Sequence, residues 1–197
     1  MEPAAILAAL LSLAAPVRHP EPEVARAARL ALVAADQARA VALEVDEGRA
    51  LFTGPAARAG EALALVAIGQ HESGFAEAFG RCEASGDHGR SLTFYQLMKG
   101  AAWFGHRREE ICPSGVLAAR LALRVLHGYK ARCAPRPMSW FRGYASGNCG
   151  VPTQAADELC TAWERLARRQ GIAGASCWQT APLKFVVKGT TTGGEKS

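Results

Sequence analysis

An apolar segment with helical spacing occupies residues 55–74 and reads PAARAGEALALVAIGQHESG. Leu65, Ile68 and Glu72 recur at intervals of three and four, so they share one face of a helix. Gly74 lies two residues after Glu72, and a glycine just past the last apolar position of a helix commonly ends that helix. The pattern predicts a helix over residues 55–72 that ends in an acidic residue on its apolar face.

Glu72 is the candidate catalytic residue, because two effects raise the pKa of an acid at the end of an apolar stripe. Burial disfavours the charged carboxylate, and the negative end of the helix dipole acts in the same direction. A carboxyl group that stays protonated near neutral pH can serve as a general acid. From the spacing alone, the alternative is that the Glu72 side chain turns into solvent at the end of the helix.

Composition and the other apolar patterns predict a mainly α fold. The 197 residues are 49% hydrophobic but only 7% aromatic, which favours closely packed helices over β-sandwich layers. Further helices are expected over residues 23–47, 115–130 and 154–169, and a loop over residues 133–150. Strands should amount to no more than a very small β-hairpin within residues 80–93. The expected fold class is therefore mainly α, or α+β with minimal strand content.

Three parts follow one another along the chain. Residues 1–50 are expected to be an N-terminal helical segment, residues 51–180 a helical domain and residues 181–197 a flexible polar tail. An apolar stripe is expected on the helix over residues 23–47: Val24, Ala28, Leu32 and Ala35. The run AAILAALLSLAA over residues 4–15 is too short to span a bilayer, so no stable membrane span is expected. It fits either a signal-peptide core or a short buried helix, since no Lys or Arg precedes it.

The charge pattern narrows the classes of partner. The formal net charge is +5, which suits an anionic polymer such as cell wall or nucleic acid. The Lys and Arg residues are scattered, however, and form no basic stripe with interleaved aromatic residues. A nucleic-acid partner is therefore not expected.

The chain has six cysteines, none in a C-x-x-C pair. An even number near loops and helix ends favours disulfides and an oxidising compartment: the periplasm, the cell exterior or a virion. Pairing of neighbours is the simplest arrangement: Cys82 with Cys112, Cys133 with Cys149, and Cys160 with Cys177. Two alternatives are free buried thiols and a metal site of Cys82, His88 and Cys112.

Three short motifs occur in order along the chain. They are Gln70-His71-Glu72-Ser73-Gly74-Phe75, Phe94-Tyr95-Gln96-Leu97-Met98 and Tyr144-Ala145-Ser146-Gly147. With them, residues 60–150 resemble the soluble lytic transglycosylases and their goose-type lysozyme relatives. That family has Glu-Ser-x-Phe at the end of an apolar helix, then Gly-Leu-Met-Gln-Leu, then Tyr-Asn-Ala-Gly. Two departures concern the substrate cleft: Thr93 stands in place of the glycine, and the third motif lacks the asparagine.

The resemblance implies a lysozyme-like catalytic domain that cleaves the β-1,4 bond between N-acetylmuramic acid and N-acetylglucosamine. Glu72 would be the general acid and base, acting through an oxocarbenium-like transition state without a cofactor or a metal. Five further residues would bind the substrate: Ser73, Tyr95, Gln96, Tyr144 and Gly147. Ser73 would hold Glu72 or the acetamido group of the sugar. The product would be a 1,6-anhydro sugar.

Two alternatives stay open. A lysozyme-type hydrolase needs a route for water, and Asp87 is the candidate second carboxylate for it. A non-catalytic module with a lysozyme-like shell, within a virion or a secretion machine, would keep the fold without the chemistry. In the enzyme alternatives the partner is a peptidoglycan glycan strand.

Overall fold

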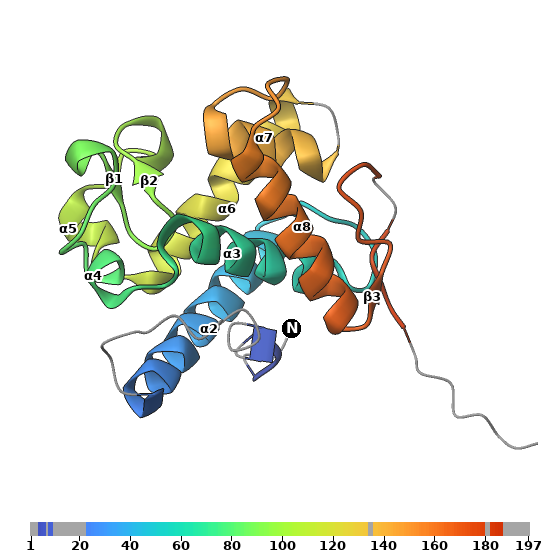
Figure 1. Ribbon diagram of the computed structural model, residues 1–197, viewed down its shortest axis with the longest axis horizontal. Coiled ribbons are helices and arrows are strands. Elements are labelled where there is room, and N and C mark those ends of the chain that lie inside the picture. Colours follow the sequence, from blue (N-terminus) through green and yellow to red (C-terminus); the bar gives the residue numbers. More distant parts are fainter. Residues whose placement is uncertain (1–3, 7, 10–22, 134–135, 180–181, 187–197) are drawn as a thin grey trace, which may run out of the picture.

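The helix predicted around Glu72 forms and lies at the centre of the molecule as α3 (Ala57–Ser73) (Figure 1). The structure is a computed structural model that describes residues 4–6, 8–9, 23–133, 136–179 and 182–186. Side chains are buried on every side of α3 between Ala59 and Gly69, as is typical of a helix inside a core. The apolar face predicted for this helix is therefore part of a wider apolar surface.

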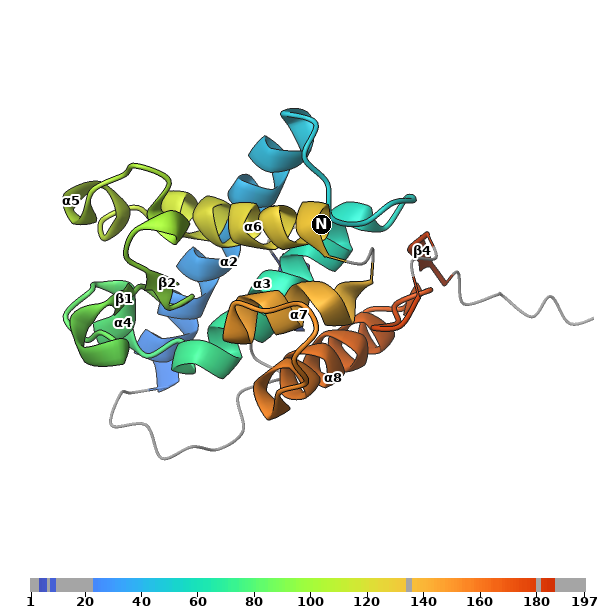
Figure 2. The same ribbon diagram turned by 90° about the horizontal axis from the view of Figure 1, so that it is seen from above.

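The helices α2 (Glu23–Asp46), α6 (Gly115–Arg132) and α8 (Gln154–Arg169) pack against α3, and α7 (Pro137–Ser146) completes the helical body. The helix α2 also packs against α6, and α8 packs across α3 (Figures 1 and 2). The shorter α7 lies against both α6 and α8. Most of the apolar core lies between these helices, and Trp163 of α8 donates its indole N–H to the carbonyl of Gly60 at 3.0 Å.

A small lobe of short elements projects from the end of α3 (Figure 1). Its elements, in order, are α4 (Glu77–Gly80), η1 (Asp87–Gly89), β1 (Ser91–Leu92), β2 (Leu97–Met98), η2 (Ala101–Trp103) and α5 (Arg108–Ile111). The strands β1 and β2 pair antiparallel, with Ser91 opposite Met98. This lobe forms one wall of the site described below.

The predicted fold class is confirmed: the described residues are mainly helical, with two antiparallel pairs of two-residue strands. Serine and threonine begin two of the predicted helices, since Ser114 accepts the N–H of Leu117 and Thr153 accepts the N–H of Ala156. None of the helices that the structure describes combines the length and the apolar character that a membrane span requires.

Two expectations about the helices were wrong. Residues 137–146 form α7 where a loop was expected; Pro137 occupies its first turn, where proline favours a helix, and Gly143 leaves room for the Tyr129 ring. The expected apolar stripe of α2 faces solvent, with Val24 83% and Leu32 70% exposed. Because alanine is spread round α2, tertiary packing selects another face: Leu30, Val33, Ala34, Gln37, Ala40, Val41 and Glu44.

The hairpin also extends beyond residues 80–93, and a second strand pair was not foreseen. β3 (Ile172–Ala173) pairs with β4 (Lys184–Phe185), and Leu183 is buried in the core. The described part of the expected tail, residues 182–186, thus packs on the helical body. The rest of that tail, residues 187–197, lies outside the described residues. So does most of the signal-like run, of which Ile6 and Ala9 are buried.

The six cysteines form three disulfides in the predicted neighbour pairing: Cys82–Cys112, Cys133–Cys149 and Cys160–Cys177. The alternatives of free thiols and of a metal site using Cys82 and Cys112 are therefore wrong. Each disulfide ties a loop to a helix or closes the ends of a helical hairpin, which stabilises the loops relative to the unfolded chain.

Candidate active site

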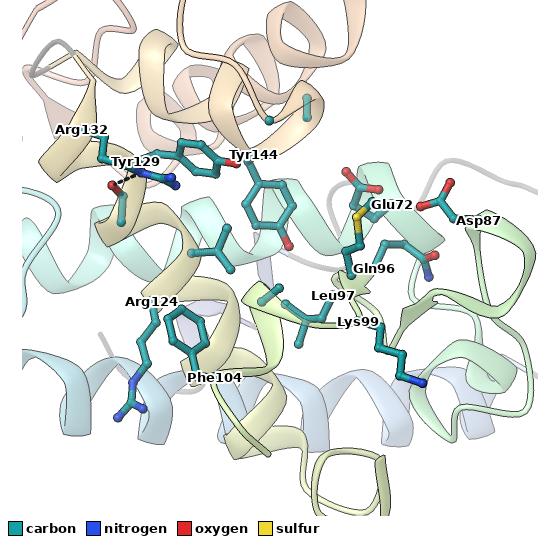
Figure 3. A pocket seen from close by; sticks show the side chains of 16 residues that line it. Glu72, Asp87, Gln96, Leu97, Lys99, Phe104, Arg124, Tyr129, Arg132 and Tyr144 are labelled. Carbon is teal, nitrogen blue, oxygen red and sulfur yellow. Dashed lines mark hydrogen bonds between the residues drawn. The ribbon is translucent and has the colours of Figure 1, made fainter. Parts of the chain in front are cut away.

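A cavity of about 510 Å³ lies between the small lobe and the helices α6 and α7. Glu72 from α3 and Asp87 from η1 lie side by side at one end of it, and Gln96 and Tyr144 extend the wall (Figure 3). Gly147, at the end of α7, lines it as well. The cavity therefore brings together one residue or more from each of the three sequence motifs.

The end of α3 places the Glu72 side chain. Gly74 adopts a left-handed conformation (φ 57°) and donates its N–H to the carbonyl of Gln70. The Ser73 hydroxyl donates to the carbonyl of Gly69 at 3.0 Å and accepts the N–H of Phe75 at 3.1 Å. A Cβ at Gly69 would come within 2.4 Å of the Phe75 ring. The motif thus folds the chain back on the helix and leaves Glu72 at the cavity.

Glu72 has the electrostatic properties of a general acid. Burial, and after it the negative charge of Asp87, raises the pKa of its carboxyl to about 7. About half of such groups carry a proton at neutral pH, so the side chain can both give and take one. Solvent exposure at the end of the helix, the alternative from the sequence, does not occur: Glu72 is half-buried.

Asp87 reaches the cavity from a tight turn of the small lobe. Its carboxylate Oδ2 accepts the Ser91 hydroxyl at 2.7 Å. An isolated bridge between Gly86 and Ser91 ties the turn to β1. Asp87 is itself exposed, so it stands nearer to solvent than Glu72. The cavity therefore holds two carboxyl groups in different surroundings, the half-buried Glu72 and the exposed Asp87.

The hairpin between β1 and β2 positions Gln96. Its amide Nε2 donates to the carbonyl of Thr93 at 3.0 Å, and its Oε1 lies where a Cβ on Gly86 would be. Thr93 has a φ of 68°, a left-handed conformation that favours glycine. The turn therefore has a backbone suited to the glycine of the family motif. The Thr93 side chain is buried and does not line the cavity.

Tyr144 is fixed by a hydrogen bond across the cavity wall. Its hydroxyl donates to the backbone carbonyl of Tyr95 at 2.6 Å. Burial, followed by the negative charge of Glu72, raises the pKa of the phenol well above its usual range. The hydroxyl is therefore neutral, and since its hydrogen is engaged it meets a ligand only as an acceptor.

Two of the predicted binding residues do not reach the cavity. The Tyr95 side chain is 2% exposed, and its hydroxyl accepts the Gln37 amide at 3.0 Å within the core. Ser73 is occupied by the backbone groups that end α3 and is not among the cavity residues. Their predicted contacts with a substrate are corrected to structural roles: Tyr95 supplies a carbonyl for Tyr144, and Ser73 ends the helix.

Sequence reasoning missed the wall that α6 contributes. The residues Val125, Gly128, Tyr129 and Arg132 line the cavity, and Figure 3 shows Tyr129 and Arg132 at the side away from Glu72. The predicted stripe of α6 includes Val125 and Tyr129, and both are only half-buried. Incomplete burial of an apolar stripe depends on which element lies opposite, so the sequence carried no signal for it. Phe104, 48% exposed, covers another part of the rim.

The two disulfides nearest the cavity enclose much of its wall. Residues 82–112, closed by one disulfide, include Asp87 and Gln96; residues 133–149, closed by the other, include Tyr144 and Gly147. Glu72 and the α6 residues lie outside both loops. The cavity is thus built from two cross-linked loops mounted on α3 and α6.

The remaining candidates lie elsewhere. Trp140 is buried in the core, and Trp178 is 54% exposed beside Arg142, away from the cavity. Among the described residues, one group of metal-ligating side chains is close enough to hold an ion, and it consists of Glu164 and the disulfide-bonded Cys160 and Cys177. Disulfide sulfurs are not thiolate ligands, so this group does not suit a metal.

Comparisons with protein-family models, with curated proteins and with solved structures found no match. The function proposed below therefore depends on the motifs and on the geometry of this cavity.

Proposed function

We propose that the protein is a lytic transglycosylase of the lysozyme-like family that cleaves peptidoglycan. The observation that carries the proposal is the position of Glu72: a half-buried carboxyl with a pKa of about 7 at the end of a cavity that Gln96 and Tyr144 also line. Three segments far apart in the sequence supply these residues, in the order of the family motifs. A coincidental likeness of short motifs would not require them to share a cavity.

The proposed reaction uses one carboxyl group for two proton transfers. Protonated Glu72 gives its proton to the glycosidic oxygen, and the bond from that oxygen to C1 of the muramic acid breaks as positive charge develops on the sugar ring. The N-acetyl group of the substrate assists at C1. The 6-hydroxyl of the same sugar then bonds to C1 and returns its proton to Glu72. The products are a 1,6-anhydro sugar and a new chain end, and no water is consumed.

The two departures from the family motifs, at Thr93 and in residues 144–147, leave the cavity open. Thr93 replaces a glycine, but its backbone adopts the left-handed conformation, and its side chain is buried and does not line the cavity. The cavity wall is therefore not blocked at this turn. The third motif retains Tyr144 and Gly147, which line the cavity, and lacks the asparagine between them.

The position of Asp87 supports a second candidate function, that of a lysozyme-type hydrolase. It lies in the same cavity as Glu72 and is accessible to water. In an inverting hydrolase such a carboxylate activates the attacking water. The transglycosylase needs no second carboxylate, so Asp87→Asn separates the two: the hydrolase loses its activity, whereas the transglycosylase retains its anhydro product.

Clearing of a peptidoglycan suspension tests the proposal. Wild type should clear it, and Glu72→Gln should not, with a loss of at least about a hundredfold, as is typical when a general acid is removed. The matched control is Glu61→Gln on the same helix. Burial also raises the pKa of Glu61 to about 7, but its side chain lies outside the cavity, so this variant should clear normally. Equal inertness of wild type and Glu72→Gln would favour the non-catalytic module.

A further inference from the structure

The end of the cavity opposite Glu72 contains an arginine whose guanidinium is held in one orientation. Arg132 lies at this end with Tyr129, across the cavity from Glu72 and Asp87 (Figure 3). Its Nε donates to the carbonyl of Gly128 at 3.1 Å. Its Cζ lies 4.6 Å from the centre of the Tyr129 ring, so the planar group stacks on an aromatic face.

Tyr129 is in turn fixed by the neighbouring helix. The ring packs against Gly143 of α7, where a Cβ would come within 2.2 Å of a ring atom. The stacking surface under Arg132 is therefore part of the packed contact between α6 and α7. One edge of the guanidinium faces the Gly128 carbonyl and one face covers Tyr129, which leaves the terminal nitrogens for a ligand.

The terminal nitrogens of Arg132 form no ion pair with the described part of the chain. No carboxylate of the part of the chain that the structure describes lies within 4.0 Å of Arg132. Arg124, also at the cavity, differs: it pairs with Glu44 at 3.2 Å and with Glu47 at 3.7 Å. Arg132 is thus the cavity arginine whose charge is available to a bound molecule.

We propose that Arg132, oriented by Tyr129, is a specificity-determining residue that binds a carboxylate carried by the glycan substrate. Two parallel N–H donors of a guanidinium match the two oxygens of a carboxylate. The inference rests on the proposed function, because the glycan reaches Arg132 only if it binds along the cavity and reacts at Glu72. A neutral glycan gains nothing from Arg132, whereas a glycan with an acidic substituent gains an ion pair.

Peptidoglycan offers two sources of that carboxylate. A stem peptide carries carboxylates on its amino acids, and a muramic acid without a peptide carries a free lactyl carboxylate. Three ligands separate them: intact glycan strands with stem peptides, strands stripped of peptide by an amidase, and a neutral chitin hexasaccharide. Binding is measured in the Glu72→Gln background, so that no ligand is consumed.

Arg132→Gln should weaken binding of at least one carboxylate-bearing ligand by about twofold to fivefold, the range for an exposed ion pair. Binding of chitin should not change. The matched control is Arg165→Gln, which removes the same charge from an exposed position on α8 outside the cavity. Loss on intact strands alone assigns the stem peptide as the source, and loss on stripped strands alone assigns the lactyl group. Arg132→Lys keeps the charge without the paired donors and should bind with intermediate affinity.

Two results would overturn the role of Arg132 but leave the proposed function standing. In the first, Arg132→Gln weakens binding of chitin as much as binding of the acidic ligands; in the second, Arg132→Gln and Arg165→Gln bind all three ligands with the same affinities. If the parent protein binds none of the three glycans, the proposed function fails as well. Thermal unfolding of Arg132→Gln at the temperature of the parent shows that the fold is unchanged.

Discussion

Replacing Glu72 with glutamine should change how the stability of the protein depends on pH. In the folded protein the pKa of Glu72 is raised from 4.5 to about 7, first by burial and then by Asp87. The folded state therefore holds this proton more tightly than the unfolded chain does. The stability that comes from it is full below about pH 4.5 and is lost as the pH rises through 7.

The size of this effect follows from the two pKa values. Between pH 5 and pH 8, a shift from 4.5 to about 7 corresponds to a loss of about 2.5 kcal/mol in the free energy of unfolding. Glu72 borders an open cavity, and solvent screens part of the interaction. We therefore expect about 1 to 2 kcal/mol. Glutamine has nearly the same shape and does not ionise, so the variant should not show this loss.

Urea unfolding of wild type and Glu72→Gln at pH 5 and pH 8 measures the difference. The stability of the variant relative to wild type should be higher at pH 8 than at pH 5 by that amount. Glu109→Gln, at an exposed position of α5, controls for the loss of one acidic residue. If the relative stability of Glu72→Gln is the same at both pH values, the Glu72 carboxyl is not a half-buried group with a raised pKa.

Three further predictions concern the groups around Glu72. Glu61 is fully buried and accepts the N–H of Leu51 at 2.8 Å, and burial raises the pKa of its carboxyl to about 7. The free energy of unfolding of wild type should therefore fall by about 2 to 3 kcal/mol between pH 5 and pH 8 because of this group, and Glu61→Gln should remove that fall; chemical denaturation at both pH values checks this. Asp87→Asn removes a negative charge beside Glu72, so the high-pH limb of the pH–rate profile should move to lower pH, though not to that of a free glutamate because burial remains; an unmoved limb would exclude their coupling. The double variant Cys133→Ser/Cys149→Ser opens the loop that carries the α7 wall, and it should lose about 3 kcal/mol of stability and most of its glycan binding while far-UV circular dichroism stays helical.

The sequence was informative wherever a local pattern determines a local structure. Helix ends were predictable because Ser114, Thr153 and Gly74 satisfy backbone groups within one turn of the chain. Glu72 was predictable for the same reason, since its place on the helix follows from the spacing and from Gly74. The disulfide pairing followed the order of the cysteines along the chain.

The sequence was uninformative where contacts between distant segments decide which face of an element is buried. The alanine-rich α2 offers two apolar faces, and contact with α6 and α3 buries the one that does not contain Val24 and Leu32. The role of Tyr95 was missed for a related reason. Tyr95 lies in the turn between β1 and β2, where side chains do not follow the alternation of a strand. The amide of Gln37 on α2, far away in the sequence, binds the phenol within the core.

Mass spectrometry of the sugar fragments released in water enriched in oxygen-18 tests the central claim most directly. If Glu72 acts as the acid and base of a lytic transglycosylase, wild type should release muropeptides with 1,6-anhydro ends that contain no oxygen-18, and Glu72→Gln should release none. Reducing ends that carry the label would show that water attacks and that the enzyme is a hydrolase. Intact glycan after incubation with wild type, or identical fragments from wild type and Glu72→Gln, would contradict the assignment of Glu72.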